Sequence, residues 1–244
     1  MSSILYPLKF KPILKDRIWG GDKLQTRLNK DLKGKDNIGE SWELSGVEGS
    51  ISVVSNGFLQ GNDLNELIEV YMGDLVGERV FKKYGEEFPL LIKFIDANDD
   101  LSIQVHPNDE LAAERHNSFG KSEMWYIMHA EPGAELISGF KHETEPEQYT
   151  KAVENNSVLS LLASYQVNKG DVFYIPAGRV HAIGKGIMLA EIQQTSDLTY
   201  RIYDYDRTDA KGNKRDLHIE EALDAINFKD THGHRLDYTT EENG

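Results

Sequence analysis

The stretch PLLIKFIDANDDLSIQVHP, residues 89–107, consists of two apolar runs joined by the polar segment 97–100. Runs rich in Leu, Ile, Val and Phe that flank turn-forming residues predict two strands in a β-hairpin. Side chains alternate between the two faces of a strand, so Ser102, Gln104 and His106 share one face of the second run. Polar side chains on a buried face cost free energy unless they find partners, and a metal ion would be such a partner.

Two later stretches contain further side chains that can bind a metal. GKSEMWYI, residues 120–127, opens a predicted strand with Lys121 and Glu123 on one face, and GDVFYIPAGRVH, residues 170–181, ends in a histidine after a Pro/Gly turn. The candidate ligands are Gln104, His106, Glu123 and His181. Two imidazoles, a carboxylate and a neutral amide suit a borderline divalent ion such as zinc, with room left for water or substrate. A single strand histidine is more often a hydrogen-bonded core residue and a single glutamate more often faces solvent, but the ordered combination favours a metal site.

The composition favours one large β domain, or a domain and a half, and disfavours several classes of protein. The chain has 244 residues, of which 39% are hydrophobic, and a formal net charge of −14. This charge disfavours nucleic acid and anionic membrane surfaces as partners. The absence of cysteine from the sequence removes disulfides, thiolate nucleophiles and thiolate ligands. The sequence has neither the core of a signal peptide nor an apolar run of membrane-spanning length, so we expect a cytoplasmic protein.

Many short predicted strands, with helices at the periphery, indicate a mainly β fold, either a β-barrel or a double-sheet jelly roll. The segment 19–21, Trp-Gly-Gly, is expected to interrupt the N-terminal strands. Glu40 is a candidate site residue, but we expect it to be a carboxylate at the rim. Helical spacing predicts helices within residues 63–71, 75–84, 107–114, 146–164 and 219–228. We divide the chain into N-terminal strands with a small helical segment packing on the barrel (1–88), a metal-binding core (89–210), and a C-terminal helix and tail (211–244).

Several motifs, in this order, resemble a known family. LSIQVHPND (101–109), GKSEMWYI and PAGRVHAIGKG (176–186) resemble the type I mannose-6-phosphate isomerases, which are zinc-dependent phosphomannose isomerases of the cupin superfamily. RIWGGDKL (17–24), IGESWELSG (38–46) and TSDLTYRIYDYDR (195–207) are similar to the short bacterial branch of that family. The resemblance covers most of residues 7–228 and implies a cupin-type jelly-roll β-barrel with peripheral short helices.

The resemblance also implies an activity and a set of site residues. Gln104, His106, Glu123 and His181 match the family's ligands for one zinc ion per chain, although other divalent metals also suit this set. The implied reaction interconverts mannose 6-phosphate and fructose 6-phosphate through an enediol. Lys93, Lys121, Glu191 and Arg201 match the family's active-site positions. Substrate binding is expected from Lys93, Lys121 and Arg201, and also from Ser102, which shares a face with Gln104; catalysis is expected from Arg201, Glu191 and Lys121. Glu191 would be the general base and Arg201 would stabilise oxyanion charge, unless these two side chains simply pair with each other.

Two other functions stay open at this point. His106, Glu123 and His181 alone have the composition of a two-histidine, one-carboxylate iron site, so a cupin Fe(II) oxygenase is one alternative. A non-catalytic sugar-phosphate-binding protein is the other, because members of the short branch usually continue past a helix like 219–228 into a second β domain. The sequence leaves open whether this chain is a natural short form or a truncated product. It leaves the oligomeric state open as well.

Overall fold

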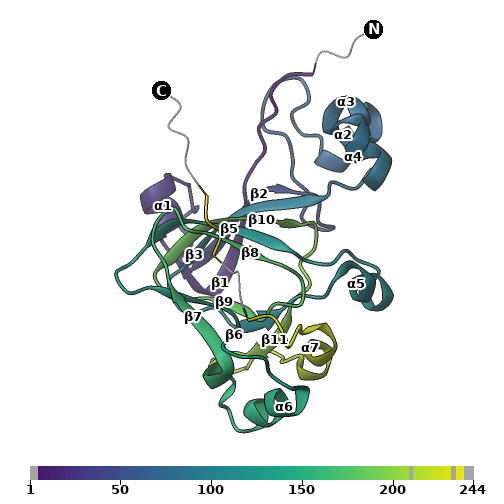
Figure 1. Cartoon of the computed structure of the whole chain (residues 1–244). Coiled ribbons are helices and arrows are strands. Elements are labelled where there is room, and N and C mark those ends of the chain that lie inside the picture. Colours follow the sequence, from purple (N-terminus) through teal and green to yellow (C-terminus); the bar gives the residue numbers. More distant parts are fainter. Residues whose placement is uncertain (1–4, 209–210, 232–234, 239–244) are drawn as a thin grey trace.

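The computed structural model describes residues 5–208, 211–231 and 235–238. The protein is mainly β, with two antiparallel sheets that pack face to face and short helices around them (Figure 1). The larger sheet has the strand order β1-β2-β3-β10-β5-β8. In chain order its strands are β1 (Ile13–Gly21), β2 (Ile38–Ser45), β3 (Leu90–Ala97), β5 (Glu123–Ala130), β8 (Val172–Ile175) and β10 (Ile187–Gln194).

The smaller sheet has the order β11-β4-β9-β6-β7. In chain order its strands are β4 (Ile103–Val105), β6 (Glu135–Phe140), β7 (Leu162–Gln166), β9 (His181–Ile183) and β11 (Tyr200–Tyr203). The predicted mainly β, cupin-type fold is confirmed, in its double-sheet form. Over the described residues, no strand of one sheet pairs with a strand of the other, so the barrel is not closed. Edge strands such as β8 and β11, with four residues each, are too short to carry the pairing around.

The main core lies between the two sheets, where the inward side chains of both meet. Ile95, Trp125 and Phe173 of the larger sheet pack in one cluster with Leu136 and Ile183 of the smaller sheet. A second cluster covers the other face of the smaller sheet and includes Ile103 and Val105. Strand alternation therefore sends the apolar residues of β4 outward and leaves its polar residues facing the space between the sheets.

The predicted hairpin over residues 89–106 is wrong. β3 pairs with β2 and β10, whereas β4 pairs with β9 and β11 in the other sheet. The segment between them crosses from sheet to sheet, with the Asn98 amide donating to the Trp19 carbonyl and the Leu101 amide donating to the Ile183 carbonyl, both at 2.9 Å. Turn residues allow a change of direction but do not choose the partner strand, so the local pattern fits a crossover equally well.

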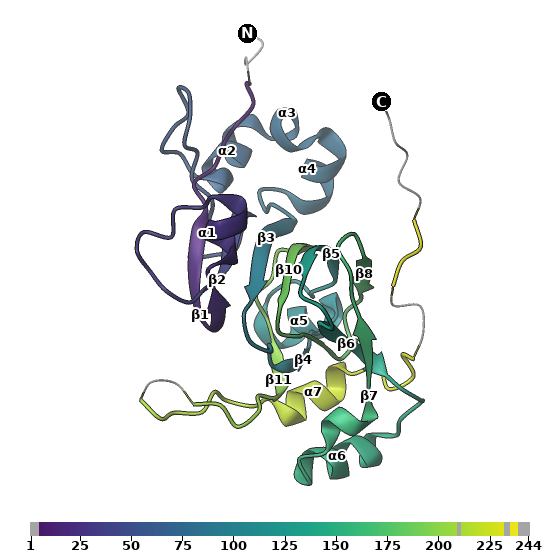
Figure 2. The ribbon, with the colours of Figure 1, turned by 90° about the vertical axis from the view of Figure 1, so that its left-hand side faces the viewer.

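The helices lie outside the sheets. They are α1 (Lys23–Leu28), α2 (Leu64–Tyr71), α3 (Gly73–Val76), α4 (Glu78–Tyr84), α5 (Asp109–His116), α6 (Pro146–Glu154), the 3₁₀ helix η1 (Val158–Leu161) and α7 (Ile219–Ala225). Figure 2 shows α2, α3 and α4 grouped beyond one end of β3, while α6 and α7 lie beside the smaller sheet. A capping box formed by Asp63 and Glu66 begins α2, within the predicted range 63–71. Within the described ranges, no helix is long and apolar enough to cross a membrane.

Two further local predictions are corrected. The segment 19–21 does not interrupt a strand but ends β1 with a bulge, and the glycines allow close approach to β2. A Cβ at Gly20 would lie 2.4 Å from the Gly39 amide nitrogen, which explains the absence of a side chain there. Residues 162–166 form β7 instead of continuing a helix, because the helical spacing ends at Leu161. The division at 88 and 210 stays a prediction, and residues 239–244 of the predicted tail lie outside the described residues.

Candidate metal centre

Strand register brings three of the candidate ligands together. Gln104 of β4 and His181 of β9 are direct cross-strand partners, so their side chains leave the sheet side by side. His106 follows β4 by one residue and lies on the same face as Gln104. The His106 and His181 ring centroids are 4.8 Å apart. Side-chain alternation along β4 brings Gln104 and His106 to one face, and pairing with the distant strand β9 adds His181. The three side chains therefore meet at one place between the sheets.

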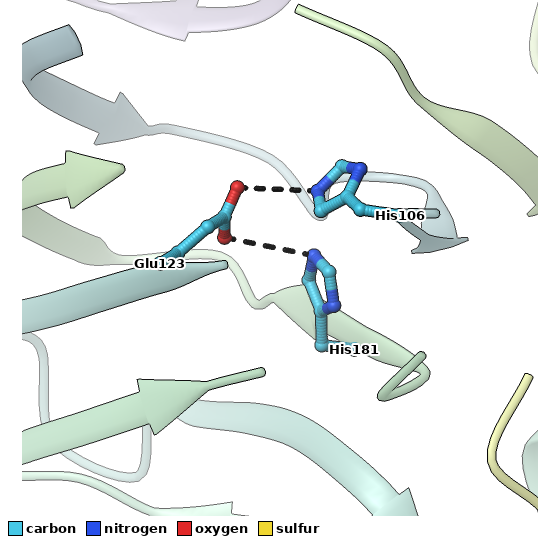
Figure 3. Close-up of side chains that lie close together, drawn as sticks. All are labelled: His106, Glu123 and His181. Atoms are coloured by element: carbon cyan, nitrogen blue, oxygen red, sulfur yellow. Dashed lines mark ion pairs between the residues drawn. The ribbon is translucent and has the colours of Figure 1, made fainter. Parts of the chain in front are cut away.

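Glu123 comes from the opposite sheet and completes the cluster. Figure 3 shows both histidine rings turned toward its carboxylate, each facing a different oxygen. His106 Nε2 lies 3.1 Å from Oε1, and His181 Nε2 lies 3.8 Å from Oε2. One ligand atom from each of these three residues lies within 4.8 Å of the others. All three side chains are buried, so the cluster is not an accidental group of surface charges.

Close contacts show which nitrogen of each histidine ring faces the centre of the cluster. The Nδ1 of His181 lies 2.9 Å from the Arg179 carbonyl, and because a carbonyl only accepts, Nδ1 carries the proton. His106 Nε2 lies 3.2 Å from Lys121 Nζ and 3.1 Å from Glu123 Oε1, so this ring nitrogen faces the cluster. The Nε2 atoms of both histidines therefore face the centre of the cluster.

The electrostatics favour the protonation states that metal ligands need. Burial, assisted by the nearby Lys121 charge, lowers the pKa of His106 from 6.5 to about 3, and burial also lowers the pKa of His181. Burial would raise the pKa of Glu123, but attraction by Lys121 and His106 outweighs it and holds that pKa well below its ordinary value. Neutral imidazoles and an ionised carboxylate are the forms that bind cations.

These residues fit a divalent ion of the zinc type. The donors are two imidazole nitrogens and one carboxylate, a set that zinc, iron and related metals accept. The Gln104 amide lies beside them, with its Nε2 3.2 Å from His181 Nε2. Because the two ends of an amide are nearly isosteric, turning it presents Oε1 as a fourth donor. Lys121 Nζ, 2.8 Å from Glu123 Oε1, places one cationic side chain at the same acceptors.

A second row of site residues runs across the larger sheet. Trp42, Lys93, Glu191 and Trp125 are successive cross-strand partners on β2, β3, β10 and β5. Lys93 Nζ pairs with Glu191 Oε1 at 2.9 Å. Burial raises the pKa of Glu191, and the Glu123 charge adds to this effect. Glu191 therefore pairs with Lys93, whereas the guanidinium of Arg201 donates to the Asp216 carbonyl at 2.9 Å.

Members of both groups line a cavity of about 580 Å³ between the sheets. Its lining includes all the predicted substrate-binding and catalytic side chains, namely Lys93, Ser102, Lys121, Glu191 and Arg201, together with Gln104 of the metal cluster. Six lysine or arginine side chains line it against four carboxylates, although the whole chain carries a net charge of −14. The cavity is thus a locally cationic place suited to an anionic ligand.

Some site residues were not found from the sequence. Lys15, Arg17, Arg215 and Trp42 also line the cavity, and Trp125 donates its indole N–H to Glu191. The placement of Glu40 at the rim is wrong, because it is only 7% exposed and lines the cavity together with Trp42. The two-residue spacing of Glu40 and Trp42 on one strand was the available signal, but the sequence alone did not show which face of β2 is buried.

Fold and site together define a class, a cupin-type β protein with a buried metal centre beside a cationic cavity. The model of the type I phosphomannose isomerase catalytic domain matches residues 7–156. The mannose-6-phosphate isomerase ManA of Bacillus subtilis (strain 168) is 44% identical over 224 residues, which are 90% of this chain and 68% of the relative. The chain therefore belongs to the type I phosphomannose isomerase family, as the sequence motifs predicted.

Solved structures agree with this placement. The crystal structure of the mannose 6-phosphate isomerase from Bacillus subtilis matches with a TM-score of 0.86 at 35% identity, covering 97% of this chain and 73% of that one. A mannose 6-phosphate isomerase structure described as holo and zinc-bound matches with a TM-score of 0.71, covering 91% of this chain and 74% of that one. Its identity is 17%, so it supports the fold alone.

Proposed function

We propose that this protein is a metal-dependent isomerase that interconverts mannose 6-phosphate and fructose 6-phosphate. One observation carries the proposal: a buried His-Glu-His cluster lies beside a cationic cavity, which is lined by the adjacent glutamine and by a buried carboxylate, Glu191. An aldose–ketose isomerisation needs a polarised carbonyl, one proton-transfer group and a site for a phosphate dianion. The relatives that carry this activity in their names support the same reaction.

Gln104, His106, Glu123 and His181 are the proposed ligands of one zinc ion. Bound there, zinc would supply a Lewis acid for the substrate carbonyl. The protein's own contribution is to keep the donors neutral or singly charged, so that the positive charge of the ion is not fully cancelled. The Arg179 carbonyl, which fixes the His181 ring through Nδ1, would set the orientation of one ligand.

Glu191 is the proposed proton carrier. It would remove the C2 proton of open-chain mannose 6-phosphate, and the electron pair of that bond would become the C1–C2 double bond of an enediol, with O1 protonated. Return of a proton to C1, with loss of the O2 proton, gives fructose 6-phosphate, so no oxidant or reductant is consumed. The raised pKa of the buried Glu191 carboxyl brings it nearer to the pH at which proton transfer in both directions is efficient.

The cations would hold the charged parts of the substrate. Lys121 reaches the metal cluster and is placed to donate to a substrate oxygen there. Arg201 lines the cavity, and among the described residues its Nε has no hydrogen-bond partner, which leaves a buried donor for an oxyanion or a phosphate oxygen. Ser102 offers a hydroxyl, 3.5 Å from Gln104 Oε1, on the same wall.

A coupled assay of fructose 6-phosphate formation tests the proposal. We expect turnover of mannose 6-phosphate that is lost after chelation and restored by zinc, and that is unchanged under nitrogen. Consumption of oxygen with an absolute need for iron would instead support the cupin oxygenase. Metal-loaded protein that binds mannose 6-phosphate without converting it would support the sugar-phosphate-binding protein.

A further inference from the structure

Trp125 bridges the metal cluster and the candidate proton carrier through a single hydrogen-bond donor. Its side chain is buried, with 1% of the residue exposed. The indole Nε1–H points between two carboxylates, 3.0 Å from Glu123 Oε2 and 2.9 Å from Glu191 Oε2. One donor is thus shared by a proposed zinc ligand and the proposed general base.

The remaining oxygen of each carboxylate is held by a lysine. Glu123 Oε1 lies 2.8 Å from Lys121 Nζ, and Glu191 Oε1 lies 2.9 Å from Lys93 Nζ. The result is a nearly symmetric chain of contacts: a lysine, a carboxylate, the indole, a carboxylate and a lysine. Each carboxylate therefore has one oxygen at the indole N–H and the other beside an ammonium, so neither carboxylate can rotate without breaking a buried contact.

Strand geometry makes this arrangement rigid. Trp125 and Glu191 are cross-strand partners, and Glu123 precedes Trp125 by two residues on the same face of β5. The indole ring also packs edge-on against His181, with ring centroids 5.3 Å apart. An indole N–H donates without carrying charge, so it holds two like charges close together and leaves the net charge of the site unchanged.

We propose that Trp125 is a positioning residue that acts through both carboxylates, orienting Glu123 for the metal and Glu191 for proton transfer. This inference rests on the proposed function, in which those two carboxylates have those roles. The simpler alternative is that Trp125 only fills the core between the sheets, where it packs in the main cluster. The two accounts differ in what the N–H does, because the core role needs only the aromatic surface.

Trp125→Phe removes the donor and keeps an aromatic ring. Zinc affinity, measured by competition with a chromophoric chelator, is the readout for Glu123, and kcat at saturating zinc is the readout for Glu191. We expect zinc to bind on the order of 10-fold more weakly and kcat to fall by on the order of 10-fold, which is the size of effect typical of groups that orient ligands. The KM for mannose 6-phosphate should stay within about 3-fold, because the indole does not line the cavity.

A matched control separates positioning from packing. Phe173 is the cross-strand neighbour of Trp125 on β8 and belongs to the same core cluster. Phe173→Leu should lower the thermal stability without changing zinc affinity or kcat. In a Glu191→Gln background, Trp125→Phe should cause no further fall in kcat but should still weaken zinc binding, because only one of its two carboxylate partners has lost its role.

The outcomes are distinct. The inference is overturned if Trp125→Phe leaves zinc affinity and kcat unchanged, or changes them no more than Phe173→Leu does. In that case the activity of the wild-type protein still supports the proposed function. An inactive, zinc-loaded wild-type protein overturns the proposed function first. Should Trp125→Phe not fold, the Trp125 indole ¹⁵N–¹H resonance of the wild type carries the test. It should move in both Glu123→Gln and Glu191→Gln, and a resonance that moves in neither variant excludes the shared donor.

Discussion

Glu40 is a buried carboxylate that holds two cations along one wall of the cavity. Its Oε1 accepts from Arg17 Nε at 2.7 Å, its Oε2 accepts from Trp42 Nε1 at 2.6 Å, and Lys93 Nζ lies 3.8 Å away. Burial alone would raise the pKa of Glu40, but Lys93, Arg17 and the Trp42 donor outweigh burial and lower the pKa from 4.5 to about 2. The folded protein therefore holds this group in its charged form.

This shift predicts a pH dependence of stability. Between about pH 2 and pH 4.5 the unfolded state binds a proton at Glu40 and the folded state does not, so the free energy of unfolding rises with pH. The contribution is complete above about pH 4.5, is lost as the pH falls toward 2, and amounts to about 3 kcal/mol. Urea unfolding at a series of pH values should show a steeper acid loss for the wild type than for Glu40→Gln. Glu43→Gln, which removes a carboxylate of the partly buried pair with Lys30, is the control and should keep the acid loss of the wild type. Parallel curves for the wild type and Glu40→Gln would contradict the prediction.

Replacing Arg201 tests whether its positive charge in the cavity contributes to catalysis. Arg201→Ala should lower kcat by on the order of 10²-fold if the guanidinium stabilises charge that develops during the reaction. Steady-state kinetics with saturating zinc provide the measurement. Arg115→Ala, which removes a surface ion pair with Asp224, is the control and should leave kcat unchanged. If Arg201→Ala lowers the melting temperature and leaves kcat unchanged, the role of Arg201 is structural.

At the scale of the element, the short strand β9 depends on a close approach to β6. A Cβ at Gly184 would lie 1.9 Å from the Glu135 carbonyl oxygen, so the backbone must move to accept any side chain there. Gly184→Ala should therefore displace β9, lower the melting temperature, and weaken zinc binding through His181 three residues earlier. Gly133→Ala, where a Cβ meets open space at φ +79°, should cost only about 1 kcal/mol and leave zinc affinity intact. Equal effects of the two substitutions would show that close approach is not the reason for Gly184.

The elements also show what the sequence could and could not predict. Alternation along a single strand was enough to place Gln104 with His106 and Lys121 with Glu123, because neighbours two apart share a face. Pairing between distant segments was not predictable in this way. The partner of Gln104 is His181 on a strand of three residues, too short to show a periodic pattern, and the crossover after β3 has the same turn residues as a hairpin. Trp125 was quoted within a motif, but its shared donor depends on the register of β5 with β10.

At the scale of the whole molecule, the proposed ligands belong to two sheets that are held together by side-chain packing. Gln104, His106 and His181 come from the smaller sheet and Glu123 comes from the larger one. An ion bound by all four would link the sheets and stabilise only the folded state. Zinc at 100 times its dissociation constant should add about 2.7 kcal/mol to the free energy of unfolding.

Thermal unfolding checks this expectation. The wild-type protein should melt at a higher temperature with zinc than with a chelator, and Glu123→Gln should reduce that difference. Magnesium, which prefers oxygen ligands, should have little effect at the same concentration. A zinc-dependent shift of the same size in the wild type and in Glu123→Gln would mean that the ion binds elsewhere.

The ligands also lie far apart along the chain, with Gln104 and His181 separated by 77 residues. Translation releases residues in order, so the set stays incomplete until His181 has left the ribosome, when β1 to β8 are already synthesised. An ion held by this set is therefore not available to guide the early strands, whose register must come from their apolar side chains. Binding of the ion would therefore be a late step, made by a chain whose first eight strands have already been synthesised.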